Sequence, residues 1–432
     1  MKRRTWSFAA VVAVLIVSPA CHRPPATTSA HGGMPLACEA ALAAGPERGD
    51  HDRTIARLQQ DARDSNPGAR GALERLGYAY VARARVRNDA GDYKLAEATA
   101  ACLDARFPDD PSSLFLKGHV LHQLHRFREA EQIGRALVAR RTFVLDYGLL
   151  GDALMEQGRL AEAADAYQRM LDLKPFYQSY TRAAHLRWLK GDVDGAIDAI
   201  RLAIAATSPR DPESAAWAWT RLAGYQLQSG RPDAALQATG NALQLQPEYA
   251  AALLTRGRIL LAQRRLSDAV DVLRRAAGAN PLPEYQWTLA DALRQHGQDA
   301  EAAAVEAELM AHGSASDPRT FALYLASRRT DLPRAAALAE EELQARADIF
   351  TLDAHAWALA ASGRAADAIP LIARAVAEGT QDGRLFLHAG VIHAAAGQPA
   401  EARAWLKKAA RLRSMLLPSE ADELARHLTG TV

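Results

Sequence analysis

The sequence lacks the short motifs that usually carry enzyme chemistry. Over its 432 residues there is no H-E-x-x-H metal motif, no G-x-S-x-G nucleophile turn, no Walker loop, no dinucleotide fingerprint and no C-x-x-C pair. We therefore expect neither an enzymatic activity nor a bound cofactor.

An excess of charge of one sign is also missing. Lys and Arg number 52 against 50 Asp and Glu, which gives a formal net charge of +2. Such a balance creates no field over the whole chain that would attract nucleic acid or an anionic membrane surface. Nucleic acid is not expected as a partner, and the 49% hydrophobic content is ample for a large folded core.

Long apolar runs are absent except near the start of the chain. Three basic residues (2–4) precede an apolar run at 8–17, which is shorter than the roughly 20 residues that cross a bilayer. Residues 1–20 therefore predict a cleaved secretion signal. Two alternatives follow: lipidation of Cys21, as in bacterial lipoproteins, or an ordinary cut after Ala20 without a lipid. We adopt the first, which predicts a protein held by its lipid at the periplasmic face of the bacterial envelope.

Cysteine is scarce, and glycine and proline gather in the segment that follows the signal. Residues 21–50 show no periodicity and predict a flexible tether ahead of the folded part, residues 51–432. Apart from Cys21, only Cys38 and Cys102 are present. They either pair in an oxidising compartment, or Cys102 is a small buried apolar residue and Cys38 a free thiol. The sequence leaves both alternatives open.

What the sequence does contain is a repeat of 33 or 34 residues, interrupted by one step of 39 residues between Gly191 and Gly230. An Ala follows each of ten turn positions by five residues, from Ala96 to Ala402. The turn positions are Gly91, His125, Gly158, Gly191, Gly230, Arg264, Gly297, Thr330, Gly363 and Gly397. A fixed period in this range is typical of stacked-repeat solenoids.

Each repeat predicts a hairpin of two amphipathic helices, because Ala, Leu, Arg and Glu recur at helical spacing and no strand pattern competes. Gly at the turn allows a left-handed residue, and the Ala lets the second helix pack closely against the first. Four prolines are expected to stop second helices: Pro108, Pro175, Pro247 and Pro281. Residues 52–64 predict an opening helix, and residues 419–428 a closing helix with Ser419 as its N-cap.

This pattern resembles the tetratricopeptide repeat over residues of about 70 to 416. In the repeat around Gly158, the family's signature positions are occupied by Tyr147, Leu150, Gly151, Leu154, Ala163, Tyr167 and Pro175. Other copies depart from it, with Arg187, Gln226 and His393 where a large apolar residue is usual and a longer first helix in the first copy. The resemblance implies an all-α, right-handed superhelix of about ten hairpins that acts as a scaffold.

The resemblance also assigns partner binding to one face of each first helix. Positions ten, six and three before each turn share that face, and aromatic anchors between polar groups suit a protein or peptide. The predicted groove residues are Phe115, His119, His122, Asp152, Glu156, His185, Trp188, Thr220, Arg258, Trp287, Asp291, Arg294, Tyr324 and Trp357. The alternative for the tryptophans, above all Trp188 and Trp357, is packing between adjacent helices.

Asparagine is rare, and none of its four residues lies on this face. The Asn-and-Lys clamp with which some tetratricopeptide proteins hold chaperone C-termini is therefore not expected.

The alternative function is the binding of a divalent metal ion in the groove. Its ligands would be His119, His122, Asp152, Glu156 and His185. The simpler interpretation, which we prefer, is a polar groove without an ion. The expected function is thus a non-catalytic envelope scaffold for an unknown protein or peptide, with metal binding as the alternative.

Overall fold

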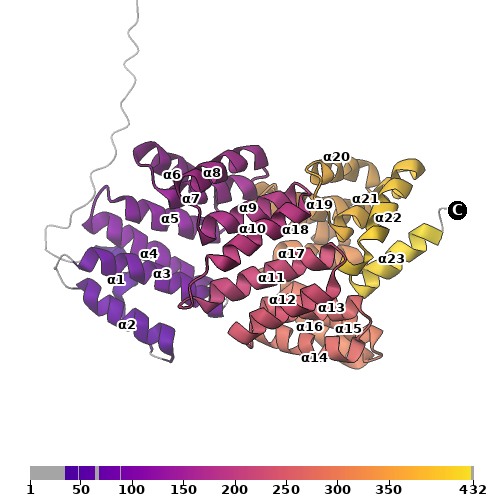
Figure 1. The fold of residues 1–432 in the computed structure, drawn as a ribbon, viewed down its shortest axis with the longest axis horizontal. Helices are drawn as coiled ribbons and strands as arrows, with labels where there is room; N and C mark the ends of the chain where they lie inside the picture. Colours follow the sequence, from indigo (N-terminus) through magenta and orange to yellow (C-terminus); the bar gives the residue numbers. More distant parts are fainter. Residues whose placement is uncertain (1–34, 47, 64–67, 88, 430–432) are drawn as a thin grey trace, which may run out of the picture.

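The computed structural model describes residues 35–46, 48–63, 68–87 and 89–429, which form 23 α-helices, one 3-10 helix and no strand (Figure 1). The predicted signal, Cys21 and the first part of the predicted tether lie outside these residues. Among the described helices, none combines the length and the apolar character needed to cross a bilayer.

Twenty of the helices form ten consecutive hairpins, which we number 1 to 10, with the first hairpins at one end of the molecule and α20–α23 at the other (Figure 1). The hairpins are α3 (Ala69–Arg87) with α4 (Ala90–Arg106), α5 (Pro111–Gln123) with α6 (Phe127–Arg140), α7 (Val144–Glu156) with α8 (Leu160–Leu173), α9 (Tyr177–Leu189) with α10 (Val193–Ala205), α11 (Pro212–Gln228) with α12 (Pro232–Leu245), α13 (Ala250–Ala262) with α14 (Leu266–Ala279), α15 (Pro283–Gln295) with α16 (Asp299–Ser316), α17 (Pro318–Arg328) with α18 (Leu332–Ala345), α19 (Ile349–Ala361) with α20 (Ala365–Val376), and α21 (Gly383–Ala395) with α22 (Pro399–Arg411). The predicted all-α repeat solenoid is confirmed.

The turns follow the predicted rule at eight of the ten positions, where φ is positive. His125 and Arg264 adopt φ of 57° and 59° without being glycine. Two positions were predicted wrongly. Gly91 lies inside α4, where its N–H is capped by a carboxylate, and at Thr330 the positive φ belongs to the two neighbouring residues instead.

The alanine five residues after each turn is fully buried in all ten hairpins. A larger side chain there would separate the two helices, which explains why the sequence keeps Ala at this spacing. Proline ends the second helices as predicted, because α4, α8, α12 and α14 each end two residues before their Pro. Most first helices contain 13 residues, but α3 has 19, as expected, and the 39-residue step lengthens α11 to 17.

The segment predicted as a tether contains a helix, which corrects that prediction. Helix α1 (Leu36–Leu42) packs on α4, and a disulfide joins Cys38 to Cys102 with their Cα atoms 4.6 Å apart. The hydroxyl of Tyr80 donates to the carbonyl of Ala41 at 2.8 Å, and Gln59 donates to the same oxygen. Helix α2 (Asp50–Arg63), predicted from residues 52–64, completes this end.

Helix α23 (Pro418–Thr429) closes the other end, after the 3-10 helix η1 (Arg413–Met415). Ser419 is not its N-cap, because it lies within the first turn of the helix. The N–H of Leu417 donates to the carboxylate of Glu420 at 2.8 Å instead. The N–H and hydroxyl of Ser419 donate to Asp291 on α15, which anchors α23 to hairpin 7.

The stack of hairpins returns on itself. The turns of hairpins 3 and 4 pack against the loops that end hairpins 8 and 9, through backbone contacts and side-chain contacts. Lys190 pairs with Glu378, and Arg346 pairs with Glu156 at 2.9 Å. The hydroxyl of Thr380 donates to the carbonyl of Leu189, 191 residues away. We call this contact the closure seam. In it, residues 156–158 meet residues 346–350, and residues 188–191 meet residues 378–381.

Two glycines allow the backbones to meet at the seam. A Cβ atom at Gly158 would lie 2.4 Å from the carbonyl oxygen of Ala347, and one at Gly191 would lie 2.4 Å from that of Gly379. Gly363 has the same φ of 79° as Gly191, but a Cβ there would have no neighbour within 4 Å. Glycine is therefore favoured at positions 158 and 191 for two reasons: the positive φ of the turn, and the lack of space for a Cβ beside the second backbone.

We predict that Gly191→Ala destabilises the protein more than Gly363→Ala. Both substitutions place Ala in a left-handed conformation, at a cost of about 1 to 2 kcal/mol. Only Gly191→Ala adds a clash with the backbone at the seam, worth a further ~1 to 3 kcal/mol. Urea unfolding of both variants measures the difference, and equal losses would show that the seam contributes nothing to stability.

Candidate functional site

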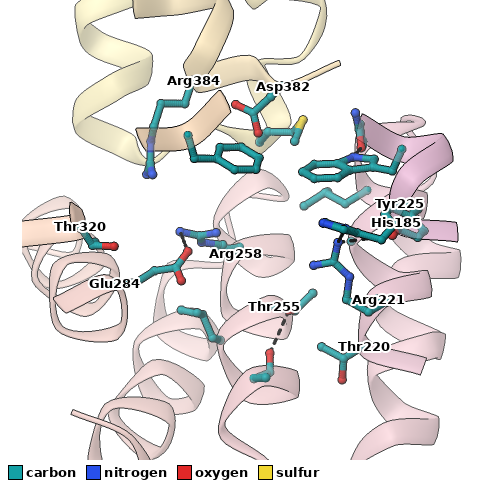
Figure 2. A pocket seen from close by; sticks show the side chains of 18 of the residues that line it. His185, Thr220, Arg221, Tyr225, Thr255, Arg258, Glu284, Thr320, Asp382 and Arg384 are labelled. Atoms are coloured by element: carbon teal, nitrogen blue, oxygen red, sulfur yellow. Dashed lines mark hydrogen bonds and ion pairs between the residues drawn. The ribbon is translucent and has the colours of Figure 1, made fainter. Parts of the chain in front are cut away.

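Closure of the stack leaves a central cavity of about 510 Å³. Seven consecutive first helices line it, from α9 to α21, together with Met415 of η1. Figure 2 shows His185, Arg221 and Tyr225 along one wall, Glu284 and Thr320 on the opposite side, and Arg384 and Asp382 above them. The cavity is therefore the inner surface of hairpins 4 to 10.

Three of the four arginines that line the cavity are paired with carboxylates. Arg258 lies 2.9 Å from Glu284, Arg319 lies 3.4 Å from Asp348, and Arg384 pairs with Glu420. Arg221 has no carboxylate partner among the residues that the structure describes. One positive charge in the wall is thus not neutralised by an ion pair.

Aromatic rings surround the guanidinium of Arg221. Its Cζ atom lies 5.5 Å from the ring centroid of Trp188, 5.9 Å from that of Trp217 and 5.2 Å from that of Tyr225. Its Nη2 lies 3.4 Å from Nδ1 of His185. Burial, assisted by the positive charge of Arg221, lowers the pKa of His185 to about 3, so this imidazole is neutral near pH 7 and can accept a hydrogen bond.

The acidic groups of the cavity already have partners. The carboxylate of Asp353 lies 2.9 Å from Nδ1 of His388. Asp382 caps α21 by accepting the N–H of Leu385 at 3.0 Å, and burial raises the pKa of its carboxyl. With Glu284 held by Arg258, none of these carboxylates contacts Arg221.

Comparison with known proteins agrees with this architecture. Sequence models of the tetratricopeptide repeat match residues 149–215, 226–289 and 354–414. The chain contains tetratricopeptide repeats. None of the curated proteins matches the sequence.

Parts of the chain are similar to several solved structures. TTC0263 of Thermus thermophilus, a thermophilic tetratricopeptide protein, is 23% identical over 45% of this chain and all of its own, with a TM-score of 0.39. MamA is 19% identical over 38% of this chain and 94% of its own, with a TM-score of 0.32. YrrB, described as having an unusual peptide-binding site, is 13% identical over 42% of this chain and 92% of its own, with a TM-score of 0.31.

Four of the residues predicted for the tetratricopeptide groove line the cavity: His185, Trp188, Thr220 and Arg258. They stand six, three, ten and six residues before their turns, as the rule requires. Glu156 faces a smaller neighbouring cavity of about 210 Å³ at the closure seam, where its carboxylate is held by Arg346. The structure therefore places four of the predicted groove residues on the wall of the cavity and Glu156 beside it.

In the C-terminal repeats, residues at the same positions before the turn are buried in the core and do not line the cavity. The prediction of groove residues is therefore corrected for Trp287, Asp291, Tyr324 and Trp357. Trp287 is only 1% exposed, because Arg384 covers its ring at 4.9 Å. Its neighbour Tyr324 packs edge-on against it, and Asp291 is covered by Ser419 of α23.

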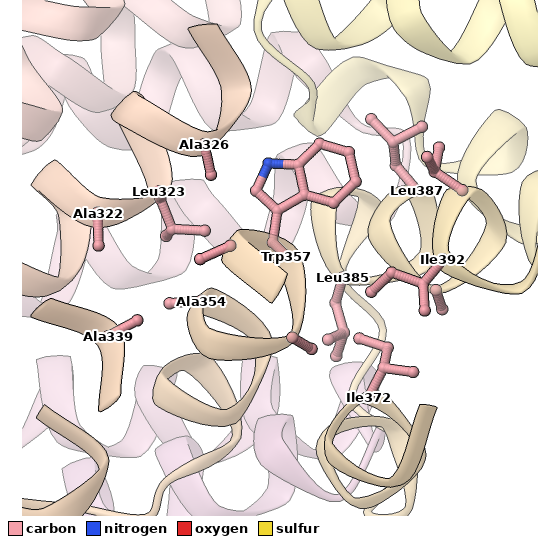
Figure 3. Close-up of a cluster of buried hydrophobic side chains, with 14 of the residues drawn as sticks. Ala322, Leu323, Ala326, Ala339, Ala354, Trp357, Ile372, Leu385, Leu387 and Ile392 are labelled. Atoms are coloured by element: carbon pink, nitrogen blue, oxygen red, sulfur yellow. The ribbon is translucent and has the colours of Figure 1, made fainter. Parts of the chain in front are cut away.

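Trp357 follows the alternative of packing between helices. It lies within a cluster of Ala and Leu side chains that includes Leu323 and Leu385 (Figure 3). Its ring stacks on His388 with centroids 4.1 Å apart, and its Nε1 donates to the hydroxyl of Ser327 at 3.0 Å. Trp188 is also largely buried, but it remains part of the cavity wall.

The remaining predicted groove residues lie outside the cavity. Phe115, His119 and His122 are on α5, where His119 contacts the ring of Tyr78. Arg294 pairs with Glu306. Hairpins 2 and 7 therefore contribute these side chains to other parts of the surface.

The proposed metal ligands are not brought together, which corrects that alternative. No group of three His, Cys, Asp or Glu side chains among the described residues could hold a metal ion. Asp152 accepts hydrogen bonds from Arg182 and from the hydroxyl of Tyr167, each at 2.8 Å. Burial alone would raise the pKa of Asp152, but the charge of Arg182 outweighs it and the pKa lies below its usual value.

Sequence reasoning missed Arg221 and Trp217, which lie at positions other than ten, six or three before the turn. A signal for them was present, because Trp217, Arg221 and Tyr225 are spaced by four residues and so share one face of α11. The residue Gln228, three positions later, extends the same wall.

We predict that zinc does not stabilise the protein through the α5 histidines. Asp152 and Glu156 are already bound to arginines, so an ion would have to displace these pairs. The thermal unfolding temperature with zinc should therefore be the same for the wild type and a His119→Ala, His122→Ala double variant. A gain confined to the wild type and lost below about pH 6, where imidazole is protonated, would restore the metal site.

Proposed function

We propose that this chain is a non-catalytic scaffold of the bacterial cell envelope that holds a short segment of another protein in its central cavity. Tetratricopeptide repeats generally build scaffolds for protein–protein interaction. The observation that carries the proposal is the convergence of seven first helices on one cavity lined by aromatic and polar side chains. Such linings are typical of binding sites, and large aromatics dominate binding energy.

The size of the cavity limits what it can hold. Its volume of about 510 Å³ lies within the roughly 300 to 1,000 Å³ of ordinary ligand pockets. A short segment fits this space, whereas an extended peptide along all ten hairpins does not, because α21 and α23 cover the inner face at hairpin 7.

Placement in the envelope is supported by two features of the chain. Residues 1–20 have the charge and apolar pattern of a secretion signal. The disulfide between Cys38 and Cys102 belongs to a type of bond that persists mainly in oxidising compartments. A lipid on Cys21 would keep the scaffold at the membrane, where its partner meets it.

A photo-crosslinking phenylalanine derivative placed at Trp217 should capture the partner in intact cells. Trp217 lines the cavity and is already aromatic, so the replacement is conservative. The same derivative at Phe143, which is 41% exposed and outside the cavity, is the control. Reproducible capture of one protein from position 217 alone supports the proposal; capture from neither position, or equally from both, refutes it.

Replacing Cys21 tests the anchor. Cys21→Ala removes the thiol that would carry the lipid, so the variant should move from the membrane to the soluble periplasmic fraction. Fractionation of cells that express each form measures this. Identical distribution of variant and wild type would mean that the chain is exported without a lipid.

A further inference from the structure

We infer that the wall of the cavity formed by α9 and α11 binds a carboxylate attached to a flat apolar group, with Arg221 as the anchoring residue. The inference rests on the proposed use of the cavity as a binding site. It goes beyond that proposal by naming the chemistry of the ligand. This chemistry follows from three features of the wall: the positive charge of Arg221, its N–H donors that lack acceptors, and the aromatic rings around it.

The charge comes from the pairing of the arginines. Among the four that line the cavity, Arg221 alone lacks a carboxylate partner within the described residues. The nearby carboxylates are held elsewhere, Glu284 by Arg258 and Asp353 by His388. An unpaired cation in a recessed, partly apolar site favours an anion, because the attraction is screened less there than in open water.

The free donors determine the kind of anion. Nε of Arg221 is buried and has no hydrogen-bond acceptor, while Nη2 makes only long contacts to His185 and to the hydroxyl of Tyr225, at 3.4 and 3.3 Å. A guanidinium presents its donors in one plane, which matches the two oxygens of a carboxylate. Nε of Arg258, on the next first helix, is also buried without an acceptor.

The rings determine what the carboxylate is attached to. Trp188, Trp217 and Tyr225 surround the guanidinium of Arg221. Phe350, from across the closure seam, stacks against Trp188 with centroids 5.8 Å apart and also lines the cavity. Flat apolar groups stack well on such surfaces. Either a free aromatic acid or an aromatic C-terminal residue of a protein segment offers this chemistry.

Calorimetric titration of the purified full chain tests the inference. The first pair of probes is 2-naphthoate and its neutral analogue 2-naphthamide. The second pair is a short peptide that ends in Trp, with a free or an amidated C-terminus. We expect the charged member of at least one pair to bind at least tenfold more tightly than the neutral member. Binding of 2-naphthoate alone identifies a free acid as the ligand, and binding of the acidic peptide identifies a chain end.

Variants assign the binding to Arg221. Arg221→Gln should weaken binding of the charged probe at least tenfold, and Arg221→Lys should restore part of it. Arg201→Gln, at an exposed position on α10, is the matched control and should bind like the wild type. If Arg221→Gln does not fold, the comparison of charged and neutral probes on the wild type still decides. No binding, equal binding within each pair, or binding unaffected in a folded Arg221→Gln overturns the inference.

Failure of this inference is distinguishable from failure of the proposed function. Capture of a protein at position 217 without any preference for a carboxylate refutes the ligand chemistry alone. Binding of 2-naphthoate that depends on Arg221, without capture of any protein, supports the ligand chemistry and refutes the protein partner.

Discussion

The architecture depends on the contact between turns and loops at the closure seam. A stack of hairpins otherwise has contacts only between neighbours, and its ends are independent of each other. Here the turns at Gly158 and Gly191 meet the backbone of Ala347 and Gly379, five hairpins later. The ion pair between Arg346 and Glu156 adds to this contact. An open stack thereby becomes a closed one, and the face that would otherwise be a groove becomes a cavity.

The seam is connected to the cavity wall by a short chain of hydrogen bonds. Nε1 of Trp188 donates to Oε1 of Gln228 at 2.7 Å, and Nε2 of Gln228 donates to the carbonyl of Gln381. Phe350, next to the loop that ends hairpin 8, stacks on the ring of Trp188. Movement at the seam would therefore displace Trp188. The shape of the site is thus fixed by residues that lie far along the sequence from the helix that carries it.

The sequence predicted what each repeat encodes locally, because the turn and the buried alanine recur in most copies and a stopping proline in four of them. It did not predict closure, which depends on how five successive hairpins stack on one another and not on the pattern within a single repeat. Trp188 and Trp357 lie three and six residues before their turns, yet of these two only Trp188 lines the cavity, since Trp357 packs in a cluster with Leu385 and its neighbours. For Cys38 and Cys102, a separation of 64 residues gave no information about their distance in space.

Two of the turn glycines show that the sequence nevertheless contains part of the information for closing the stack. His125 and Arg264 adopt the left-handed conformation at equivalent turns, so φ alone does not require glycine. At Gly363 a Cβ would have no neighbour within 4 Å, so glycine there is favoured only by the positive φ of the turn. At Gly158 and Gly191 the carbonyl oxygen of another backbone occupies the place of the Cβ, and no other residue fits. The information for closing the solenoid therefore includes these two glycines, which a reading of one repeat at a time cannot distinguish from the others.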